Sequence, residues 1–244
     1  FITLMFFIRI PKQSAESAEL SLIKSAKSGL DFLKSHKQVL MLIMYLSAIN
    51  LVASMYEAVL PAMVLSRKGG GTQALGAVNT CVGAATLIGS IIATLMPKPK
   101  SRRRVICLSL LFSMSTENFF LAFRQTPLLW CTGAVLGWIV IPMMSANLDV
   151  IMRTKVPCHM QGRVYSARNT LQFFTIPLGN FLGGLAVDTF AEPLMAAMPH
   201  NSLMCNIFGS GKGSGAALIF FIIGIMGVAV CLIFNSNKHI KEIE

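Results

Sequence analysis

The chain has 244 residues, of which 54% are hydrophobic and only 13% are charged. A soluble domain usually carries about 25% charged residues, so this composition excludes an ordinary soluble domain. The net charge of +11 does not indicate a nucleic-acid partner, because the basic residues lie in short connections between apolar segments. These segments reach about 20 residues, the length that crosses a bilayer, and lack the alternation of a membrane barrel. We predict an all-α integral membrane protein, because helices then satisfy the backbone in lipid.

The chain opens with an apolar segment and a polar one. Phe1–Ile10 is too short to cross a bilayer at about 1.5 Å per residue, and we expect it to be the end of a spanning helix that begins before Phe1. Pro11–Gln38 is polar, with spaced apolar residues and several lysines. It is predicted to be a cytoplasmic linker. Two interpretations stay open for it: an amphipathic helix on an anionic leaflet, or a solvated linker with some helix.

Six predicted spans follow and form a bundle over residues 39–235, with a polar tail over residues 236–244. Their expected bounds are Val39–Leu65, Ala74–Pro97, Val105–Phe123, Leu128–Ile151, Val164–Phe190 and Ala216–Phe234. Pro177 is expected to kink the fifth span. The spacings Gly133-x-x-x-Gly137 and Gly179-x-x-x-Gly183 are typical of membrane helices that approach one another closely.

Lysine and arginine residues are distributed unevenly between the two sides of this topology. Arg67, Lys68, Arg124 and Lys212 fall on one side, and every other Lys and Arg falls on the opposite side. Cytoplasmic connections carry the excess of basic residues, so the second side is predicted to be cytoplasmic. The linker and the C-terminal tail are then cytoplasmic, and the expected location is the plasma membrane, which is the inner membrane of a bacterium.

Several stretches of the chain carry a resemblance to a known family. They are TKVPCHMQGRVYSARN, the following IPLGNFLGGLAVD, the closing NKHIKEIE, the early IRIPK and the KSGLDFLKSHKQVLMLIM before the first full span. In this order they resemble the C-terminal half of major facilitator superfamily transporters. The nearest branch is the drug and macrolide efflux group, which includes siderophore exporters. The resemblance covers essentially the whole chain.

The resemblance implies a twelve-helix fold, to which this chain contributes the end of helix 6 and helices 7–12. Helices 7 and 10, the first and fourth spans, would face a central cavity, while helices 9 and 12 would lie outside. The implied partners are membrane lipids, a small-molecule substrate and an N-terminal six-helix half. The implied energy source is a proton gradient, with no cofactor. Gly89–Arg104 is placed like the family's signature cytoplasmic loop but lacks its aspartate, which leaves proton coupling unassigned.

Two carboxylates lie inside predicted spans, where an ionisable group is costly and is a functional candidate by default. Glu57 lies in a span that the resemblance turns toward the cavity. It either binds a cationic substrate or a proton, or is held near the outer interface beside Arg67 and Lys68, and both interpretations stay open. Glu117 is a secondary candidate, because the resemblance places its helix outside. A structural role shared with Asn118 is expected there.

Three further residues are candidates for binding the substrate. Asn50, Trp138 and Asn147 lie in the two spans that are expected to line the cavity. Polar amides with one aromatic ring suit an amphipathic molecule, because apolar contact supplies the affinity and a few polar groups orient the ligand. Hydrogen bonding between helices is the competing use of the amides.

The stretch CHMQGRVYSARN is predicted to form a cytoplasmic hinge between the fourth and fifth spans, with Gly162 letting the chain turn. Asp149 ends the fourth span at a depth similar to that of Arg163 and Arg168, so an ion pair across adjacent helices is expected. A pair present in only one state of a transporter would bias the equilibrium between states. An anchor that follows the positive-inside rule is the alternative role of the arginines.

No covalent, metal or nucleotide chemistry is predicted. Cys158–His159 lacks the further ligands of a tetrahedral metal site and the orienting group of a catalytic pair. The six cysteines show no CxxC spacing and are expected to be inert. The stretch NIFGSGKGSGAA departs from the Walker pattern at Asn206 and Gly213. The outer connection Ala191–Gly215 is therefore expected to be a flexible extracellular loop.

The predicted function is secondary active export of small drug-like molecules by alternating access, with proton coupling implied by the resemblance and no enzymatic site. The alternative is a truncated or non-transporting six-helix membrane protein that acts through a binding partner.

Overall fold

The computed structural model describes residues 22–123, 126–199 and 201–243, with side chains from residue 27 onward. Within these ranges the chain is all-helical, and six helical segments are long and apolar enough to cross a membrane. The prediction of an all-α chain with six helices that can cross a membrane is confirmed, as expected of a multi-pass membrane protein. Phe1–Ile10 and the first part of the linker lie outside the described residues.

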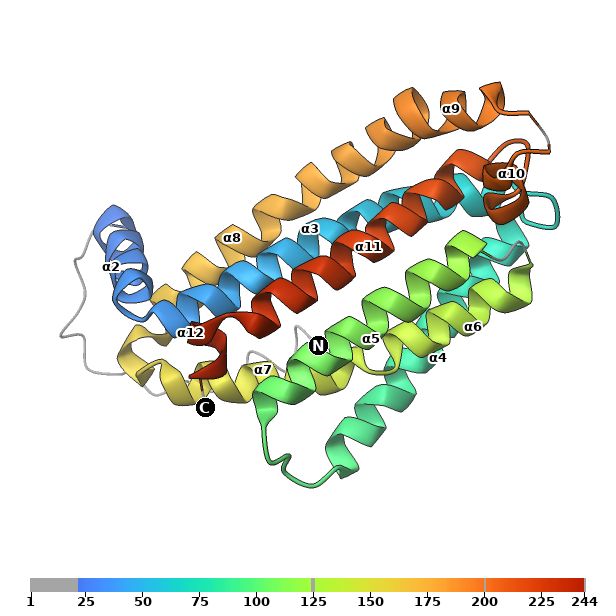
Figure 1. The fold of residues 1–244 in the computed structure, drawn as a ribbon. Coiled ribbons are helices and arrows are strands. Elements are labelled where there is room, and N and C mark those ends of the chain that lie inside the picture. Colours follow the sequence, from blue (N-terminus) through green and yellow to red (C-terminus); the bar gives the residue numbers. More distant parts are fainter. Residues whose placement is uncertain (1–21, 124–125, 200, 244) are drawn as a thin grey trace, which may run out of the picture.

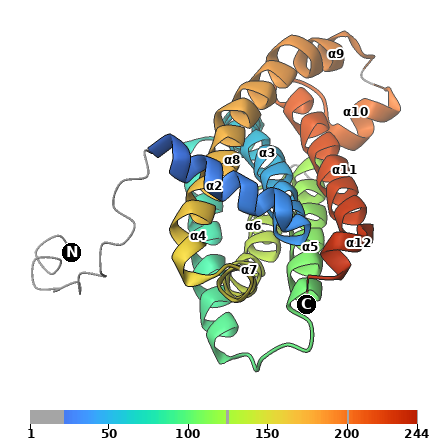
Figure 2. The same ribbon diagram turned by 90° about the vertical axis from the view of Figure 1, so that its left-hand side faces the viewer.

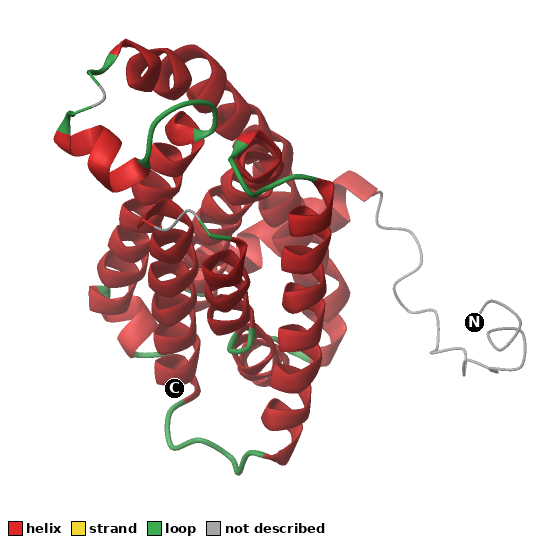
Figure 3. Ribbon diagram, turned by 90° about the vertical axis from the view of Figure 1, so that its right-hand side faces the viewer, coloured by secondary structure: helices red, strands yellow, loops and turns green. Residues whose placement is uncertain are grey.

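The helices follow one another through short connections (Figure 3). Their bounds are α2 Leu22–Ser35, α3 Lys37–Ser66, α4 Thr72–Leu95, α5 Arg102–Phe123, α6 Pro127–Trp138, α7 Ile141–Lys155, α8 Cys158–Leu185, the π-helix η1 Ala186–Ala191, α9 Glu192–Ala197, α10 Leu203–Phe208, α11 Ser214–Ser236 and α12 Lys238–Lys241. Each predicted span corresponds to one or more of these elements. The fourth span is divided into α6 and α7, and the fifth continues from α8 through η1 into α9.

The helices pack in two groups that meet along α11 (Figure 1). On one side α8 packs along α3, and α3 packs against α11. On the other side α5 packs against α11, α6–α7 packs on α5, and α4 covers α6–α7. Helices α3 and α5 are the most buried of the six spans, whereas most residues of α4, α6–α7 and α8 are partly or fully exposed. Such exposed apolar faces are suited to contact with lipid or with another membrane helix.

The second half of the linker is a helix that docks on the bundle. Helix α2 crosses the ends of α8 and α3 (Figure 2). Its Leu33 is buried, and Gly29 packs against the backbone of Arg163 at the start of α8, while Lys27 and Lys34 are exposed. This arrangement is amphipathic, and the apolar side of α2 is covered at least in part by protein.

The fourth span is broken at Ile139 and Val140, between α6 and α7. Pro142 has no N–H to donate to the carbonyl of Trp138, so the helical ladder is interrupted at this point. Helix α4 passes close to the break through Gly89, where any Cβ would collide with the Ile139 carbonyl. A small residue in α4 therefore accommodates the irregular backbone.

Helix α8 approaches α3 as closely as its glycines predicted. Cβ atoms at Gly179 and Gly183 would collide with the backbone of Leu51 and Met55. Pro177 lies inside α8 in this region, and the helix continues past it to Leu185. The small-residue spacing is thus confirmed as a close helix–helix contact.

The connection from Ala191 to Gly215 is partly helical within the described residues, whereas the sequence predicted a flexible loop. It contains α9 and α10, and the Glu192 carboxylate accepts the backbone N–H groups of Gly213 at 2.9 Å and Ala216 at 3.3 Å. This carboxylate caps the N-terminus of α11, where its negative charge also interacts favourably with the positive end of the helix dipole.

The same outer cluster holds Arg67, directly after α3. The Arg67 guanidinium is buried and donates to the carbonyls of Gly213, at 3.2 Å, and Phe208. Burial lowers the pKa of Arg67, and the nearby Glu192 carboxylate opposes this shift. Arg67 thus joins the outer ends of α3, α10 and α11 rather than holding Glu57 at the interface.

We predict that Gly89→Val destabilises the protein by about 1–3 kcal/mol, because a side chain there has to displace the backbone of the α6–α7 break. Thermal unfolding in detergent would measure the change. The matched control is Gly76→Val on the same helix, where a Cβ meets no atom within 4 Å. Equal unfolding temperatures for the two variants would show that the contact does not constrain α4.

Candidate functional site

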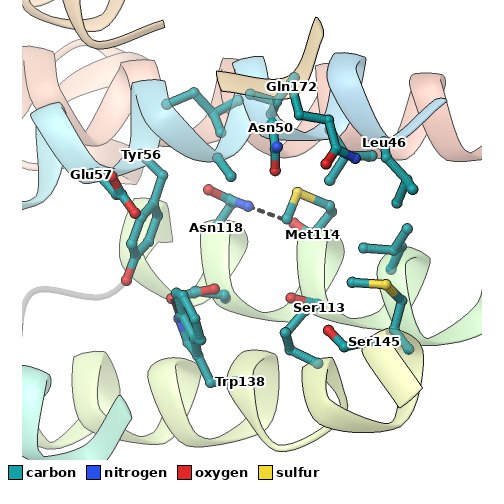
Figure 4. Close-up of a pocket in the computed structure, with 18 of the residues that line it drawn as sticks. Leu46, Asn50, Tyr56, Glu57, Ser113, Met114, Asn118, Trp138, Ser145 and Gln172 are labelled. Atoms are coloured by element: carbon teal, nitrogen blue, oxygen red, sulfur yellow. Dashed lines mark hydrogen bonds between the residues drawn. The ribbon is translucent and has the colours of Figure 1, made fainter. Parts of the chain in front are cut away.

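A cavity of about 330 Å³ lies between α3, α5, α6–α7, α8 and α11 (Figure 4). Its apolar lining is Leu46, Ile49, Val52, Ala53, Leu110, Met114, Ile141, Met144, Leu148 and Ile223. Its polar lining is Asn50, Tyr56, Glu57, Ser113, Glu117, Asn118, Trp138, Ser145, Arg168 and Gln172. Apolar walls with several polar groups are the usual composition of a site for a small organic molecule.

Glu117 is the most deeply buried carboxylate of the cavity, with 4% of its surface exposed. It accepts a hydrogen bond of 2.7 Å from Nε1 of Trp138, the last residue of α6. The side chain also lies against Gly137, where a Cβ would overlap it. No Lys or Arg among the described residues forms an ion pair with Glu117. A charge buried in this way is costly, so the site favours a proton or a bound cation.

Two more buried polar groups face the cavity without a hydrogen-bond partner among the described residues. The Tyr56 hydroxyl is unpaired, although it lies close enough to Glu117 to interact with it. Asn118 donates its amide to the Met114 carbonyl at 2.8 Å, which leaves its own Oδ1 unpaired. Figure 4 shows Tyr56, Asn118 and Trp138 around one space. An unpaired buried group costs about 1–3 kcal/mol, which a ligand or water would recover.

The cavity brings together three of the four predicted substrate-binding residues. Asn50 and Glu57 line it from α3, and Trp138 lines it from α6. Glu57 is exposed, so its carboxylate is open to solvent or to a neighbouring molecule. The prediction that Asn147 lines this cavity is wrong: it accepts from Nη1 of Arg102 at 3.1 Å, donates to the Met143 carbonyl at 2.8 Å and lines a different pocket.

Glu117 and Asn118 are the residues that sequence reasoning undervalued. The resemblance placed their helix outside, but α5 turns both side chains toward the cavity. The polar pair inside an otherwise apolar helix was the available signal. Helical spacing also places Glu117 one turn after Ser113, which lines the same cavity.

The predicted ion pair forms between Asp149 and Arg168. Their Oδ1 and Nη1 atoms are 3.8 Å apart, with side-chain exposures of 53% for Asp149 and 16% for Arg168. Arg168 also donates from Nε to Oε1 of Gln172 at 3.2 Å, and its guanidinium lies over the Tyr165 ring. Both Arg168 and Gln172 line the cavity, so the ion pair with Asp149 involves a residue of the cavity wall.

Arg163 and Gly162 do not have their predicted roles. Arg163 donates to the Ser28 hydroxyl at 3.2 Å and therefore holds α2 rather than Asp149. The stretch CHMQGRVYSARN forms the first turns of α8, and Gly162 lies inside the helix, where a Cβ would meet no atom within 4 Å. The turn between the spans occurs instead at Val156 and Pro157, because proline favours an extended residue before it.

Comparisons of the chain with protein-family models, with curated proteins and with solved structures give no match in any of the three.

We predict that Glu117→Ala lowers the free energy of unfolding by about 1–3 kcal/mol, because it leaves the Trp138 N–H unpaired in a buried site. Glu117→Gln keeps an acceptor of the same shape and should unfold at or above the wild-type temperature. Glu57→Ala is the control, since that carboxylate is exposed. If Glu117→Ala and Glu57→Ala unfold alike, the hydrogen bond does not stabilise the fold.

Proposed function

We propose that the chain is the C-terminal six-helix half of a major facilitator superfamily transporter and serves in the export of small drug-like molecules. The observation that carries this proposal is the cavity itself: apolar walls surround a buried carboxylate and two unpaired buried polar groups. This lining suits an amphipathic molecule that carries a positive charge or a hydrogen-bond donor.

The packing of the helices supports this family. The first three spans, α3, α4 and α5, correspond in order to the last three, α6–α7, α8 and α11. Each main contact between two spans then has an equivalent contact between the corresponding spans. The contact of α3 with α8 corresponds to that of α6–α7 with α4, and the contact of α5 with α6–α7 corresponds to that of α11 with α3. Helices α5 and α11 are equivalent to each other, so their mutual contact lies at the centre of this correspondence. Internal repeats of three helices within a six-helix half are typical of this class of transporter.

Each cavity residue then has a role in the proposed transport. The aliphatic and Met side chains supply apolar contact, and Trp138 offers an aromatic face to a cation. Glu117 carries a proton or the substrate cation, because its burial opposes an uncompensated charge. Exposed Glu57 attracts the cation from the open side of the cavity. Alternate occupancy of Glu117 by proton and substrate would couple export to a proton gradient.

The partners and the orientation follow from the same proposal. An N-terminal six-helix half would cover the exposed apolar faces of α4 and α8 and close the cavity, with lipid around the remaining faces. The end that carries α2, α7 and α12 is rich in lysine and arginine and is proposed to be cytoplasmic, in the plasma membrane.

In vesicles that contain the full-length protein, we expect lipophilic cations or macrolides to move when a pH gradient is imposed. Glu117→Gln should reduce gradient-dependent movement on the order of tenfold or more, because the loss of a charged hydrogen-bonding partner is worth about 1.5–3 kcal/mol. The control is Asp188→Asn, which removes an exposed carboxylate outside the cavity. A panel of such compounds that shows no gradient-dependent movement would contradict the export proposal and favour a non-transporting, partner-binding protein.

The Asp149–Arg168 pair is proposed to belong to one transport state only. Asp149→Asn should then change the unfolding free energy by no more than about 1 kcal/mol but alter the transport rate severalfold, because it shifts the balance between states. Glu242→Gln is the matched control, since it removes the exposed pair with Lys238, also at 3.8 Å. Equal transport rates of the two variants would contradict a role of the Asp149–Arg168 pair in the transport cycle and would favour the role of Arg168 as an anchor at the membrane surface.

A further inference from the structure

A second hollow of about 290 Å³ lies where α2 meets α3, beside the end of α7 and the start of α12. Figure 1 shows these elements gathered at one end of the bundle. The lining residues are Ser35, His36, Lys37, Gln38, Val39, Lys155 and His239. None of them lines the central cavity, so this basic crevice is a separate feature of the molecule.

The ionisable residues of the basic crevice are all lysine or histidine. Among the residues that the structure describes, no acidic one lines the crevice. Of the acidic residues at this end, Glu242 pairs with Lys238 and Asp149 pairs with Arg168, while Asp31 is exposed on α2 outside the lining. Neither Lys37 nor Lys155 forms an ion pair within the described ranges. Lys155 is half-buried, so its charge is partly withdrawn from water without a compensating anion. The crevice therefore has an uncompensated positive potential.

His36 is held in one orientation at the edge of the crevice. Its Nδ1 lies 3.0 Å from the Phe32 carbonyl and 3.1 Å from the Ser35 hydroxyl, and its ring stacks on Phe32 with centroids 4.0 Å apart. No hydrogen bond of the described residues involves the other ring nitrogen, Nε2, which is therefore open to a ligand, and both ring nitrogens are donors when the imidazole is protonated.

The backbone brings helix ends of both signs to the crevice, because α3 begins there at Lys37 whereas α2 ends at Ser35 and α7 ends at Lys155. The 30-residue helix α3 begins at Lys37, has no side-chain hydrogen bond at its N-cap and carries no acidic residue in its first turn. Its first N–H groups, at Lys37 and Gln38, therefore face the crevice without a capping carboxylate. The basic side chains, together with the free N–H groups at the start of α3, therefore favour an anion with several acceptor oxygens.

We infer that the basic crevice is a binding site for a phosphate group, with Lys37, Lys155, His36 and His239 as its donors. Lysine ammonium groups and a helix N-terminus both bind phosphate oxygens well. Basic pockets between membrane helices at the cytoplasmic end hold the head groups of anionic lipids. The same chemistry would accept free phosphate. A bound phosphate would bridge α3, α7 and α12 and hold their ends together, and this inference does not depend on the proposed transport.

The test measures how much lipid the full-length protein retains, by native mass spectrometry after exchange into nanodiscs of phosphatidylglycerol or phosphatidylcholine. The protein should retain phosphatidylglycerol preferentially. Lys37→Gln/Lys155→Gln should retain it roughly thirtyfold less tightly, from about 1 kcal/mol for each basic residue near the surface. The matched control, Lys68→Gln/Lys212→Gln, removes the same charge from two exposed lysines at the other end and should bind like the wild type.

A second variant separates charge from folding. Lys37→Arg/Lys155→Arg keeps both charges and should keep the lipid, whereas a loss as large as that of the glutamine variant would indicate disturbed packing and overturn the site. Inorganic phosphate is then added as a competitor. Displacement of the lipid identifies a site for free phosphate as well, and no displacement identifies a lipid head-group site. Equal retention of phosphatidylglycerol by the glutamine variant and its control would overturn the inference.

Discussion

The hydrogen bond between Trp138 and Glu117 joins the two parts of the molecule on which the candidate site depends, because it fixes a carboxylate to the irregular point of the fourth span. Trp138 ends α6 just before the break at Ile139 and Val140, and Glu117 reaches it from α5. In hydrocarbon, a buried polar group has to find its partner inside the protein. In the proposed transporter, a proton or a cation at Glu117 would act directly on the end of α6, at the break in the fourth span.

The two hollows of the molecule differ in the kind of charge that they can hold. The central cavity combines apolar walls with polar groups, and its carboxylates Glu57 and Glu117 and the unpaired Oδ1 of Asn118 are acceptors. The basic crevice lies at the end of the bundle and contains only donors among its charged groups. Electrostatic interactions are strong in the first because water is scarce, whereas those in the second are screened by salt. The central cavity is therefore suited to selective binding of a small molecule, and the basic crevice is suited to anchoring an anionic group.

The two ends of the bundle are also held together differently. At the outer end, Arg67 and Glu192 bind backbone groups of the segment before α11, so both charges are used to satisfy main-chain carbonyls and N–H groups. At the opposite end, Arg163 holds α2 through Ser28, and Arg168 pairs with a half-exposed Asp149. Buried hydrogen bonds to backbone are the more costly to break. The end with α2 is therefore the one where helices can rearrange with less loss of free energy.

The sequence by itself determined the number of spans, their approximate bounds and the basic character of one end, because hydropathy and length are sufficient to recognise a membrane helix. The close contact at Gly179 and Gly183 and the pair of Asp149 with Arg168 were also predictable, from small-residue spacing and from depth in the membrane. Only the tertiary structure decided which way each helix faces. Spans such as α3 and α6 are apolar all round, so their sequences do not specify a rotation about the helix axis. On α5 and α7, too, the packing of the helices decided that Glu117 lies in the cavity and Asn147 outside it.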